Sequence, residues 1–514
     1  MNMNRIFDID YNKVFEQLTY NLSQPMLFNS GVFLWLFLMF TFVYMLLKRR
    51  DTLRLLFVTL FSYYFYYKSS GIYFFLLAVV TISDYLIAKG ICKVQTNHDG
   101  MGYNRNAKGK WLLALSLVID LGLLGYFKYT NFFGTLCADI TGNHFDVLDI
   151  FLPVGISFFT FQSLSYIIDV YRGTIKPLNS ILDYAFYVSF FPQLVAGPIV
   201  RAHDFIPQIR KPIEITKEMF GTGVFFIVGG LFKKAVISDY ISINYVERVF
   251  DQPSLYSGFE NLMGIYGYAL QIYCDFSGYS DMAIGIALLL GFKFPINFNA
   301  PYKSSSITEF WRRWHISLSS WLKDYLYISL GGNRKGKIRQ YINLLITMLL
   351  GGLWHGASLN FVVWGGLHGI LLTIDKIWKQ ICPRLSPVQS KHDTVKPNKF
   401  ISFIGGIVTF HIVCLAWVFF RCDSFDTAFS MILQIFNNFQ SQVALQWITG
   451  YWAVATLILL GYMLHFMPQR LSAFTKRMVI KMPFLLQVLF IVMVIYIVIQ
   501  IKSSDVLPFI YFQF

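Results

Sequence analysis

Two histidines in aromatic surroundings are the residues best suited to chemistry: His315, in the run FWRRWHISLSSW, and His355, in GGLWHGA. A neutral imidazole held out of water can take a proton from an alcohol near neutral pH. Because a hydroxyl is a poor nucleophile at its own pKa, acyl transfer to oxygen needs such a base. Each histidine could instead have a purely structural role. His315 could be a core residue whose hydrogen bonds are satisfied, and His355 could form a hydrogen bond at a helix break.

Two aspartates in the apolar run LQIYCDFSGYSDMAIG, Asp275 and Asp281, are further candidates. Ionisable groups at membrane depth are costly unless they face a wet cavity or a partner. The alternative role is a buried hydrogen bond that locks the helix to a neighbouring tyrosine, serine or arginine. The residues alone leave both roles open.

Other catalytic signals are weak or absent. His368 and His411 also lie in apolar runs and are weaker candidates. His144 and Asp149 have the HxxxxD spacing of another acyltransferase class, but they lie in an expected outer loop without the flanking residues of that class. The sequence has no Walker A loop, GxSxG elbow or HExxH motif, and its six cysteines show no zinc spacing. Neither a metal nor a bound cofactor is therefore expected.

The composition is that of a membrane protein with many spans. Of 514 residues, 55% are hydrophobic and only 14% are charged, against about 25% in a typical soluble protein. Apolar runs of about 18 to 22 residues recur, which is the length that crosses a bilayer as a helix. The net charge of +15 comes from lysines and arginines between these runs, as the positive-inside rule requires, so no nucleic-acid partner is expected.

We expect an all-α polytopic fold of about 11 transmembrane helices, with re-entrant, broken and interfacial segments, in one membrane domain of residues 26–514. Residues 1–25 are expected to form an amphipathic N-terminal extension with no signal peptide. The simple spans are expected at 31–47, 53–67, 71–92, 111–133, 219–237, 259–291, 400–420, 451–467 and 484–502.

Two regions break the simple alternation of spans. Segments 151–169 and 181–200 are both apolar but have basic residues between and after them, so at least one is re-entrant or broken. The run 340–372 is too long for one span and has basic loops before and after it, so we expect it to enter and return on the same side. Charge counting places both chain termini outside the cytoplasm and the basic region 303–339 inside it.

This basic region has the pattern of an interfacial helix. Ser306 and Glu309 match a capping box, which predicts a helix start. The residues of one aromatic and apolar face then recur at three- and four-residue steps: Trp311, Trp314, His315, Leu318, Trp321, Leu322 and Tyr325. Such a helix would lie along the cytoplasmic interface with His315 on its buried face. Its basic side chains would suit an anionic donor. Alternatively, they reflect only the positive-inside rule.

These stretches together resemble a known family. The runs FWRRWHISLSSWLKDYLYISLGGNRKG and GGLWHGASLNFVVWGGLHG are similar to the membrane-bound O-acyltransferases, and most similar to the bacterial branch that contains the membrane component of alginate O-acetylation. FFPQLVAGPIVR (190–201) and the run from 270 to 302 support the resemblance. It extends from Met26 to the C-terminus.

The resemblance implies a fold and a set of site residues. The fold would be a ring of tilted helices around a central funnel. His355 would be the catalytic residue and His315 its companion. Substrate binding would involve the neighbouring tryptophans and the residues at motif positions: Trp314, Trp354, Asp275, Asp281, Asn333 and Arg334.

The function that follows is acetyl transfer from a cytoplasmic thioester, acetyl-CoA or another acyl thioester, towards an extracytoplasmic polysaccharide. The protein would lie in a bacterial inner membrane, in contact with membrane lipid, and a separate periplasmic acetyltransferase would complete delivery. The same fold with another acyl group, such as D-alanine for teichoic acid or a lipid acyl chain, is the first alternative. A transporter or flippase of an acylated carrier is the alternative without catalysis.

Overall fold

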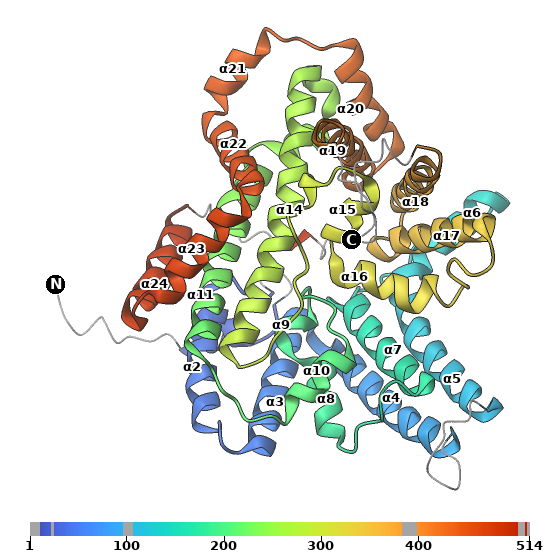
Figure 1. Cartoon of the computed structure of the whole chain (residues 1–514), viewed down its shortest axis with the longest axis vertical. Coiled ribbons are helices and arrows are strands. Elements are labelled where there is room, and N and C mark those ends of the chain that lie inside the picture. The colour runs from blue at the N-terminus through green and yellow to red at the C-terminus, as the bar shows by residue number, and fades with distance from the viewer. Residues whose placement is uncertain (1–10, 22–24, 96–105, 383–397, 502–508, 511–514) are drawn as a thin grey trace. The chain divides into compact units, whose positions relative to one another are not determined.

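The computed structural model describes residues 11–21, 25–95, 106–382, 398–501 and 509–510, and within these residues it contains helices and no strand (Figure 1). The predicted all-α class is confirmed. The chain packs as two compact units. The first comprises Met1–Ile215 with Leu290–Lys293, and the second comprises Thr216–Leu289 with Phe294–Phe514.

The first unit is built from ten α-helices in its described part. They are α1 (Tyr11–Leu18), α2 (Gly31–Leu46), α3 (Asp51–Ser70), α4 (Phe74–Gln95), α5 (Ala107–Leu124), α6 (Thr130–Thr141), α7 (Ile156–Arg172), α8 (Ile181–Ser189), α9 (Phe191–Leu194) and α10 (Ala202–Ile209). The expected segment 181–200 is broken, because α8 and α9 are short and Phe190 separates them. Of the N-terminal extension, only α1 is a described helix, since residues 1–10 and 22–24 lie outside the described residues.

The second unit carries all of the candidate site residues. Its α-helices are α11 (Lys217–Leu231), α12 (Asp239–Ile241), α13 (Glu247–Asp251), α14 (Gly258–Leu289), α15 (Ile307–Arg313), α16 (Ile316–Trp321), α17 (Lys337–His355), α18 (Leu359–Ile381), α19 (Lys399–Arg421), α20 (Phe425–Asn437), α21 (Val443–Gly450), α22 (Trp452–Phe466), α23 (Gln469–Lys481) and α24 (Phe484–Ile501). Three π-helical segments, 232–238, 242–246 and 322–327, connect some of them.

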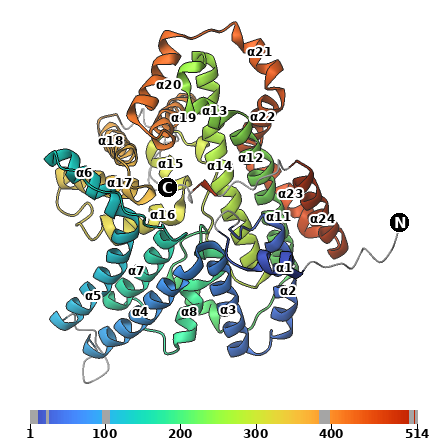
Figure 2. The ribbon, with the colours of Figure 1, turned by 180° about the vertical axis from the view of Figure 1, so that it is seen from behind.

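Helices α11 and α14 run side by side, as Figures 1 and 2 both show. Glycine allows this close approach: a Cβ added at Gly230 would lie 2.5 Å from the carbonyl oxygen of Gly278. Small residues at such contacts are typical of packed membrane helices. The pairing fixes the aspartates of α14 against the lysines that follow α11.

The run 340–372 forms two packed helices, and its expected return to the same side of the membrane stays a prediction. Helix α17 ends at His355, α18 begins at Leu359, and the two pack against each other. A Cβ at Gly352 would lie 2.2 Å from the carbonyl oxygen of Phe361, so this hairpin requires glycine there. The predicted break at His355 is confirmed.

Fewer described helices than the expected 11 are long and apolar enough to span a membrane. Five described helices are long and apolar enough to cross a membrane, or up to seven if each bent pair is one span. The bent pairs are α21 with α22, at 92°, and α23 with α24, at 118°. Helix α2 is only 16 residues long, and α14, although it has 32 residues, carries aspartates and serines in its middle. Short, bent and polar helices therefore account for much of the difference.

Candidate active site

The predicted continuous helix after Ser306 is wrong at His315. Helix α15 ends at Arg313, and His315 takes the left-handed conformation (φ +42°, ψ +56°) before α16 begins at Ile316. Backbone hydrogen bonds to a neighbouring segment hold this break: Asn299 N donates to Arg313 O, and Ile316 N donates to Asn297 O, both at 2.9 Å. Such strained backbone is concentrated at functional sites.

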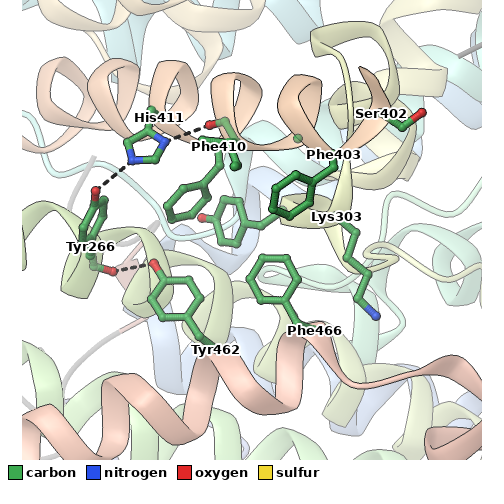
Figure 3. Close-up of a pocket in the computed structure, with 11 residues that line it drawn as sticks. Tyr266, Lys303, Ser402, Phe403, Phe410, His411, Tyr462 and Phe466 are labelled. Carbon is green, nitrogen blue, oxygen red and sulfur yellow. Dashed lines mark hydrogen bonds between the residues drawn. The ribbon is translucent and has the colours of Figure 1, made fainter. Parts of the chain in front are cut away.

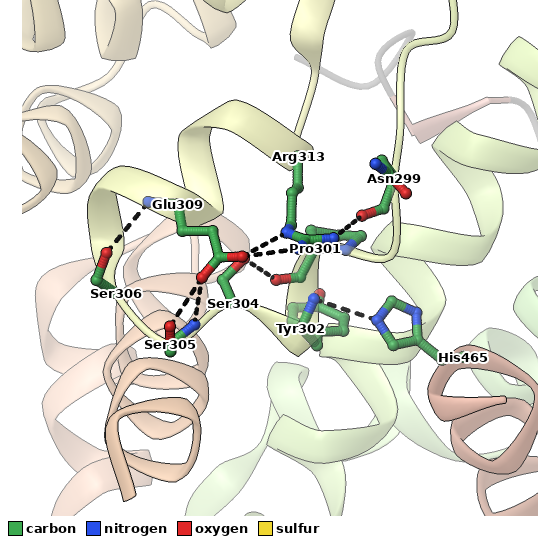
Figure 4. A network of polar contacts seen from close by, with 9 residues as sticks. All are labelled: Asn299, Pro301, Tyr302, Ser304, Ser305, Ser306, Glu309, Arg313 and His465. Carbon is green, nitrogen blue, oxygen red and sulfur yellow. Dashed lines mark hydrogen bonds and ion pairs between the residues drawn. The ribbon is translucent and has the colours of Figure 1, made fainter. Parts of the chain in front are cut away.

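The predicted helix start is confirmed (Figure 4). Ser306 is the N-cap of α15, and its Oγ accepts a hydrogen bond from Glu309 N at 3.3 Å. The Glu309 carboxylate accepts hydrogen bonds from N and Oγ of Ser305, at 2.9 and 2.8 Å, rather than from the backbone of the N-cap residue. Its other oxygen forms an ion pair with Arg313 at 2.7 Å. These contacts rigidify the turn that leads to His315.

His315 is fully buried and its tautomer follows from its partner. Its Nδ1 lies 3.1 Å from Oδ1 of Asn297, which also accepts hydrogen bonds from N and Oγ of Ser317. Because Oδ1 is an acceptor, Nδ1 carries the proton and the lone pair is on Nε2. That Nε2 is buried and has no hydrogen-bond partner in the described part of the chain. Burial lowers the pKa of His315, which lies outside the membrane-spanning helices, to about 3, so the ring is neutral near pH 7.

His355 lies beside this ring at the end of α17. The two imidazole centroids are 6.5 Å apart, which is farther than in a directly hydrogen-bonded pair. The ring of His355 meets Trp364 and Phe420 edge-on, with centroids at 5.1 and 5.4 Å, and the residue is 2% exposed. The structure thus brings the two predicted histidines together in a nearly dry aromatic pocket.

The two predicted tryptophans have different positions. Trp354 contacts both histidines, with ring centroids 5.0 Å from His355 and 6.1 Å from His315. Trp314 is fully buried and packs on Trp417 at 4.9 Å and on Phe298 at 5.1 Å. Trp314 therefore supports the site from behind, and its contact with substrate stays a prediction.

Both predicted aspartates form ion pairs with consecutive lysines. Asp275 Oδ1 lies 2.5 Å from Lys234 Nζ, and Asp281 Oδ2 lies 2.7 Å from Lys233 Nζ. The structural alternative thus has lysines as the partners, where tyrosine, serine and arginine were the examples expected. The next residue after Asp275 is Phe276, whose ring meets His315 edge-on at 4.6 Å. Both ion pairs therefore lock α14 to the segment that follows α11, and a role of either aspartate in substrate binding stays a prediction.

Asn333 and Arg334 are not brought to the histidines by any contact in the described residues. Both are exposed in the turn that precedes α17. Arg334 N donates a hydrogen bond to Gly331 O at 3.1 Å, and the buried Asn343 holds the turn by donating to Gly332 O. A role for these two side chains in substrate binding stays a prediction.

The weaker histidine candidates lie elsewhere. His411 bonds to the hydroxyl of Tyr266 at 2.9 Å, on the wall of a mainly apolar cavity of about 540 Å³ (Figure 3). His368 is buried beneath Trp364 and accepts a hydrogen bond from the indole of Trp311 at 3.3 Å. His144 is exposed and its nearest carboxylate is Asp146, not the residue of the HxxxxD pattern.

Comparison with known proteins shows to which protein family this site belongs. A family model of the membrane-bound O-acyltransferases matches residues 174–419, a range that contains both histidines and both aspartates. The chain is 40% identical over 417 residues to the probable alginate O-acetylase AlgI of Pseudomonas aeruginosa, covering 80% of this chain and 75% of that protein. The chain belongs to the membrane-bound O-acyltransferase family.

Two other relatives of this acyltransferase are named for different activities. A peptidoglycan O-acetyltransferase of Helicobacter pylori is 37% identical over 437 residues, which is 79% of each chain. A teichoic acid D-alanyltransferase of Bacillus subtilis is 29% identical over 288 residues, covering 53% of this chain and 69% of that protein. The family and the apolar helices make the protein a multi-pass membrane acyltransferase.

A cavity of about 420 Å³ lies among the helices that carry the histidine pair of the acyltransferase, although neither histidine lines it. Its lining comes from α15 to α18 and includes Ile316, which directly follows His315 in the chain. The walls are mainly apolar, and three cationic residues also line the cavity: Arg312, Lys323 and Lys376. An apolar channel with cations at its wall can hold a molecule with an extended apolar arm and an anionic end.

Asn297 is a site residue that sequence reasoning missed. It lies 18 residues before His315, in INFNAPY at the end of the run 270–302 that supports the resemblance, but neither its residue type nor its spacing indicates a contact with His315. Only the folded chain shows its role, since its side chain fixes the ring of His315 and donates to Ser280 Oγ at 3.2 Å. We regard it as a positioning residue.

Replacing Asn297 by leucine should lower kcat about 10- to 100-fold with little change in the donor KM, because the ring of His315 loses the acceptor that sets its tautomer. Asn297→Asp keeps the acceptor but adds a negative charge, so it should raise the pKa of His315 and move the acidic limb of the rate profile to higher pH. The measurement is kcat against pH. Asn343→Leu, which also removes a buried asparagine, is the matched control; an equal loss of kcat in that variant would contradict a positioning role.

Proposed function

We propose that this acyltransferase moves an acetyl group from a cytoplasmic acetyl thioester, acetyl-CoA, to hydroxyl groups of an extracytoplasmic polysaccharide. The observation that carries the proposal is the buried pair of His315 and His355, with centroids 6.5 Å apart and a lone pair at Nε2 of His315. Relatives named as alginate and peptidoglycan O-acetylating proteins support the choice of an acetyl group and a glycan.

In the proposed reaction His355 acts as general base on the attacking hydroxyl. As the hydroxyl oxygen bonds to the thioester carbonyl carbon, the proton passes to the imidazole, the C–S bond breaks, and the proton then passes to the leaving thiolate. His315 cannot polarise the carbonyl by donation at Nε2 while it is neutral with its proton on Nδ1. Its Nε2 can instead accept a hydrogen bond from an amide N–H of the pantetheine arm and so orient the donor.

The donor is proposed to enter through the cavity lined by Arg312, Lys323 and Lys376. Charge counting puts the loops around α17 and α18 on the cytoplasmic side, where acyl thioesters are made. The apolar wall suits the pantetheine arm, and the cations suit the phosphates of the nucleotide end. With this orientation we propose that both chain termini lie outside the cytoplasm, that the protein lies in a bacterial inner membrane, and that a periplasmic acetyltransferase completes delivery.

The double variant Arg312→Ala/Lys376→Ala should raise the KM for acetyl-CoA about 10-fold or more without lowering kcat to the same degree, since charge-assisted contacts to phosphate are lost. The effect should shrink as salt rises. Lys335→Ala, an exposed lysine outside the cavity, is the control. Unchanged donor KM in the double variant would reject this entry route.

One alternative substrate has a specific observation in its favour. The teichoic acid D-alanyltransferase relative supports D-alanine on a carrier protein as an alternative acyl group, over a smaller part of the chain than the O-acetylating relatives. The experiment that distinguishes the two acyl groups supplies the purified protein, in nanodiscs, with either acetyl-CoA or a D-alanyl carrier protein. Mass spectrometry of added oligosaccharides should show acetyl esters with the first donor, and D-alanyl esters alone would contradict the proposal.

A further inference from the structure

The mainly apolar cavity of about 540 Å³ that lies between α14, α19 and α22 takes no part in the proposed reaction (Figure 3). One face of α19 forms much of its wall, and this α19 cavity shares no lining residue with the donor cavity. Phe403 and Phe466 line it and are 65% and 50% exposed. Because α19 is long and apolar enough to span the bilayer, these rings face lipid and the cavity is open to the membrane from the side.

The depth of the α19 cavity fits one leaflet of the bilayer. Ser402 and Phe410, eight residues apart on α19, both line it, and this separation is about 12 Å along a helix. The hydrocarbon core of a bilayer is about 30 Å thick, so one leaflet accounts for about 15 Å. Charge counting puts Lys399, at the start of α19, on the cytoplasmic side. An acyl chain of the cytoplasmic leaflet would therefore fit along this wall.

The polar groups at the deep end of the α19 cavity are satisfied within the protein. Nδ1 of His411 bonds to Ile407 O at 2.8 Å, and its Nε2 bonds to the hydroxyl of Tyr266 at 2.9 Å. The hydroxyl of Tyr462 donates to Tyr266 O at 2.8 Å. Figure 3 shows these residues at the end of the cavity away from Lys303. His411 thus offers no polar atom to a ligand, and this end suits the tail of an apolar chain.

Lys303, at the other end, has no anionic partner among the described residues. Its Nζ donates to the carbonyl oxygen of Met467 at 2.6 Å, and no described carboxylate forms an ion pair with it. The charged group that acts on Lys303 is a second cation, Arg313, and the nearby carboxylate of Glu309 is already paired with Arg313 at 2.7 Å. A phosphate group would supply the missing anion.

The helices around this end contain basic residues and no acidic ones. Helices α19, α22 and α23 have no Asp or Glu in their sequences. Lys399 lies three residues before Ser402 on α19, and Arg470 follows Met467 by three residues. Lysines and arginines at the cytoplasmic surface of a membrane attract anionic lipids. The charge at the mouth of the cavity therefore favours an anionic headgroup.

Gly406, in the wall of the α19 cavity, leaves room for a ligand. Among described atoms, a Cβ added at Gly406 would meet only the carbonyl oxygen of Ser304, at 3.9 Å. Close helix packing, which requires glycine at Gly230, does not require it here. Glycine inside a helix is less stable than alanine, so its presence at this wall is consistent with a ligand that fills the space.

From this arrangement we infer that the α19 cavity binds one anionic phospholipid of the cytoplasmic leaflet, with an acyl chain along α19 and the phosphate paired with Lys303. A lipid such as phosphatidylcholine carries the same chains and phosphate, but the basic residues at the mouth would repel its choline cation. The inference goes beyond the proposed function, because this lipid takes no part in the transfer step.

Native mass spectrometry of the full chain in detergent tests the site with two probes of identical acyl chains, phosphatidylglycerol and phosphatidylcholine. The first bound phosphatidylglycerol should bind at least about 5-fold more tightly than phosphatidylcholine. Lys303→Gln should weaken phosphatidylglycerol binding about 5-fold and leave phosphatidylcholine binding nearly unchanged, because only the cation is lost. Gly406→Leu should weaken the binding of both lipids at least about 10-fold, because the new side chain occupies the place of the acyl chain.

The controls are Lys335→Gln, which changes an exposed lysine outside the cavity, and Gly229→Leu, at a helix position whose Cβ would meet no described atom within 4 Å. Both should bind lipid as wild type does. Equal binding of the two lipids by wild type, or unchanged selectivity in Lys303→Gln, would overturn the inference, and so would unchanged binding by a folded Gly406→Leu. Displacement of the lipid by glycerol phosphate alone would indicate a site for free phosphate instead. A lipid-free dimer that is lost in Gly406→Leu would show that a second copy of the chain covers the cavity, which would also overturn the inference.

Discussion

The variant His355→Gln should lose acetyl transfer by about 10³-fold, within the range that a positioned general base contributes. The ring of His355 lies in a pocket of Trp354, Trp364 and Phe420, and glutamine can fill much of its volume but cannot accept a proton at neutral pH. The rate constant should fall while the KM values for donor and acceptor change little, because the lost interaction belongs to the transition state. The measurement is acetyl ester formed by the purified protein with saturating acetyl-CoA.

A histidine outside the proposed site serves as the control for loss of an imidazole side chain. His411 bonds to Tyr266 on the wall of a different cavity, so His411→Gln should keep most of the activity while losing a comparable polar group. Both variants should elute as folded monodisperse protein and melt within a few degrees of wild type. If His355→Gln transferred acetyl groups at a rate within a factor of about three of the wild-type rate, His355 could not be the general base.

Replacing His315 by asparagine should lower kcat about 10²-fold, the second-largest effect that the site predicts. Asparagine is the better replacement because it tolerates the left-handed conformation that His315 adopts (φ +42°), whereas alanine would add backbone strain. The variant keeps a side-chain donor for Asn297 but lacks the lone pair at Nε2. The measurement is the steady-state rate of acetyl ester formation across pH 5 to 8.

The pH profile gives a second readout for His315. Burial lowers the pKa of its ring to about 3, so the wild-type rate should contain no titration from His315 between pH 5 and 8. In the unfolded chain the ring binds a proton below about pH 6.5, so this group makes the folded protein less stable as pH falls from 6.5 towards 3. The asparagine variant should lack that part of the acid sensitivity. If the wild-type rate changed with pH between 5 and 8 and His315→Asn lacked that change, the ring of His315 would titrate in this range, and the neutral ring would be contradicted.

Local patterns in the sequence predicted much of the site. The break at His355 follows from a run too long for one span and bounded by basic loops, and the N-cap at Ser306 follows from the spacing of serine and glutamate. Both features are set by nearby residues, and both are confirmed. The resemblance paired His315 with His355, and the fold places them together.

The parts that the sequence did not predict depend on distant segments. The aromatic periodicity of residues 311–325 fits one continuous helix, yet backbone hydrogen bonds with Asn297 and Asn299 interrupt it at His315. The partners of Asp275 and Asp281 are lysines about 40 to 50 residues earlier, which only the packing of α11 on α14 brings close. Fewer described helices than the expected 11 meet the length and composition test, because apolar composition does not reveal where a helix bends or stops.

Transfer across the bilayer tests the central claim that a donor from one face meets a hydroxyl from the other at the two histidines. Proteoliposomes would carry cellotetraose trapped inside and radiolabelled acetyl-CoA outside, with the fraction of each protein orientation determined by protease protection. Molecules with the basic region outward should place labelled acetyl esters on the trapped sugar, and His355→Gln should reduce that label to background. Label on the trapped sugar that appears only after detergent is added, or that persists in His355→Gln, would contradict the account.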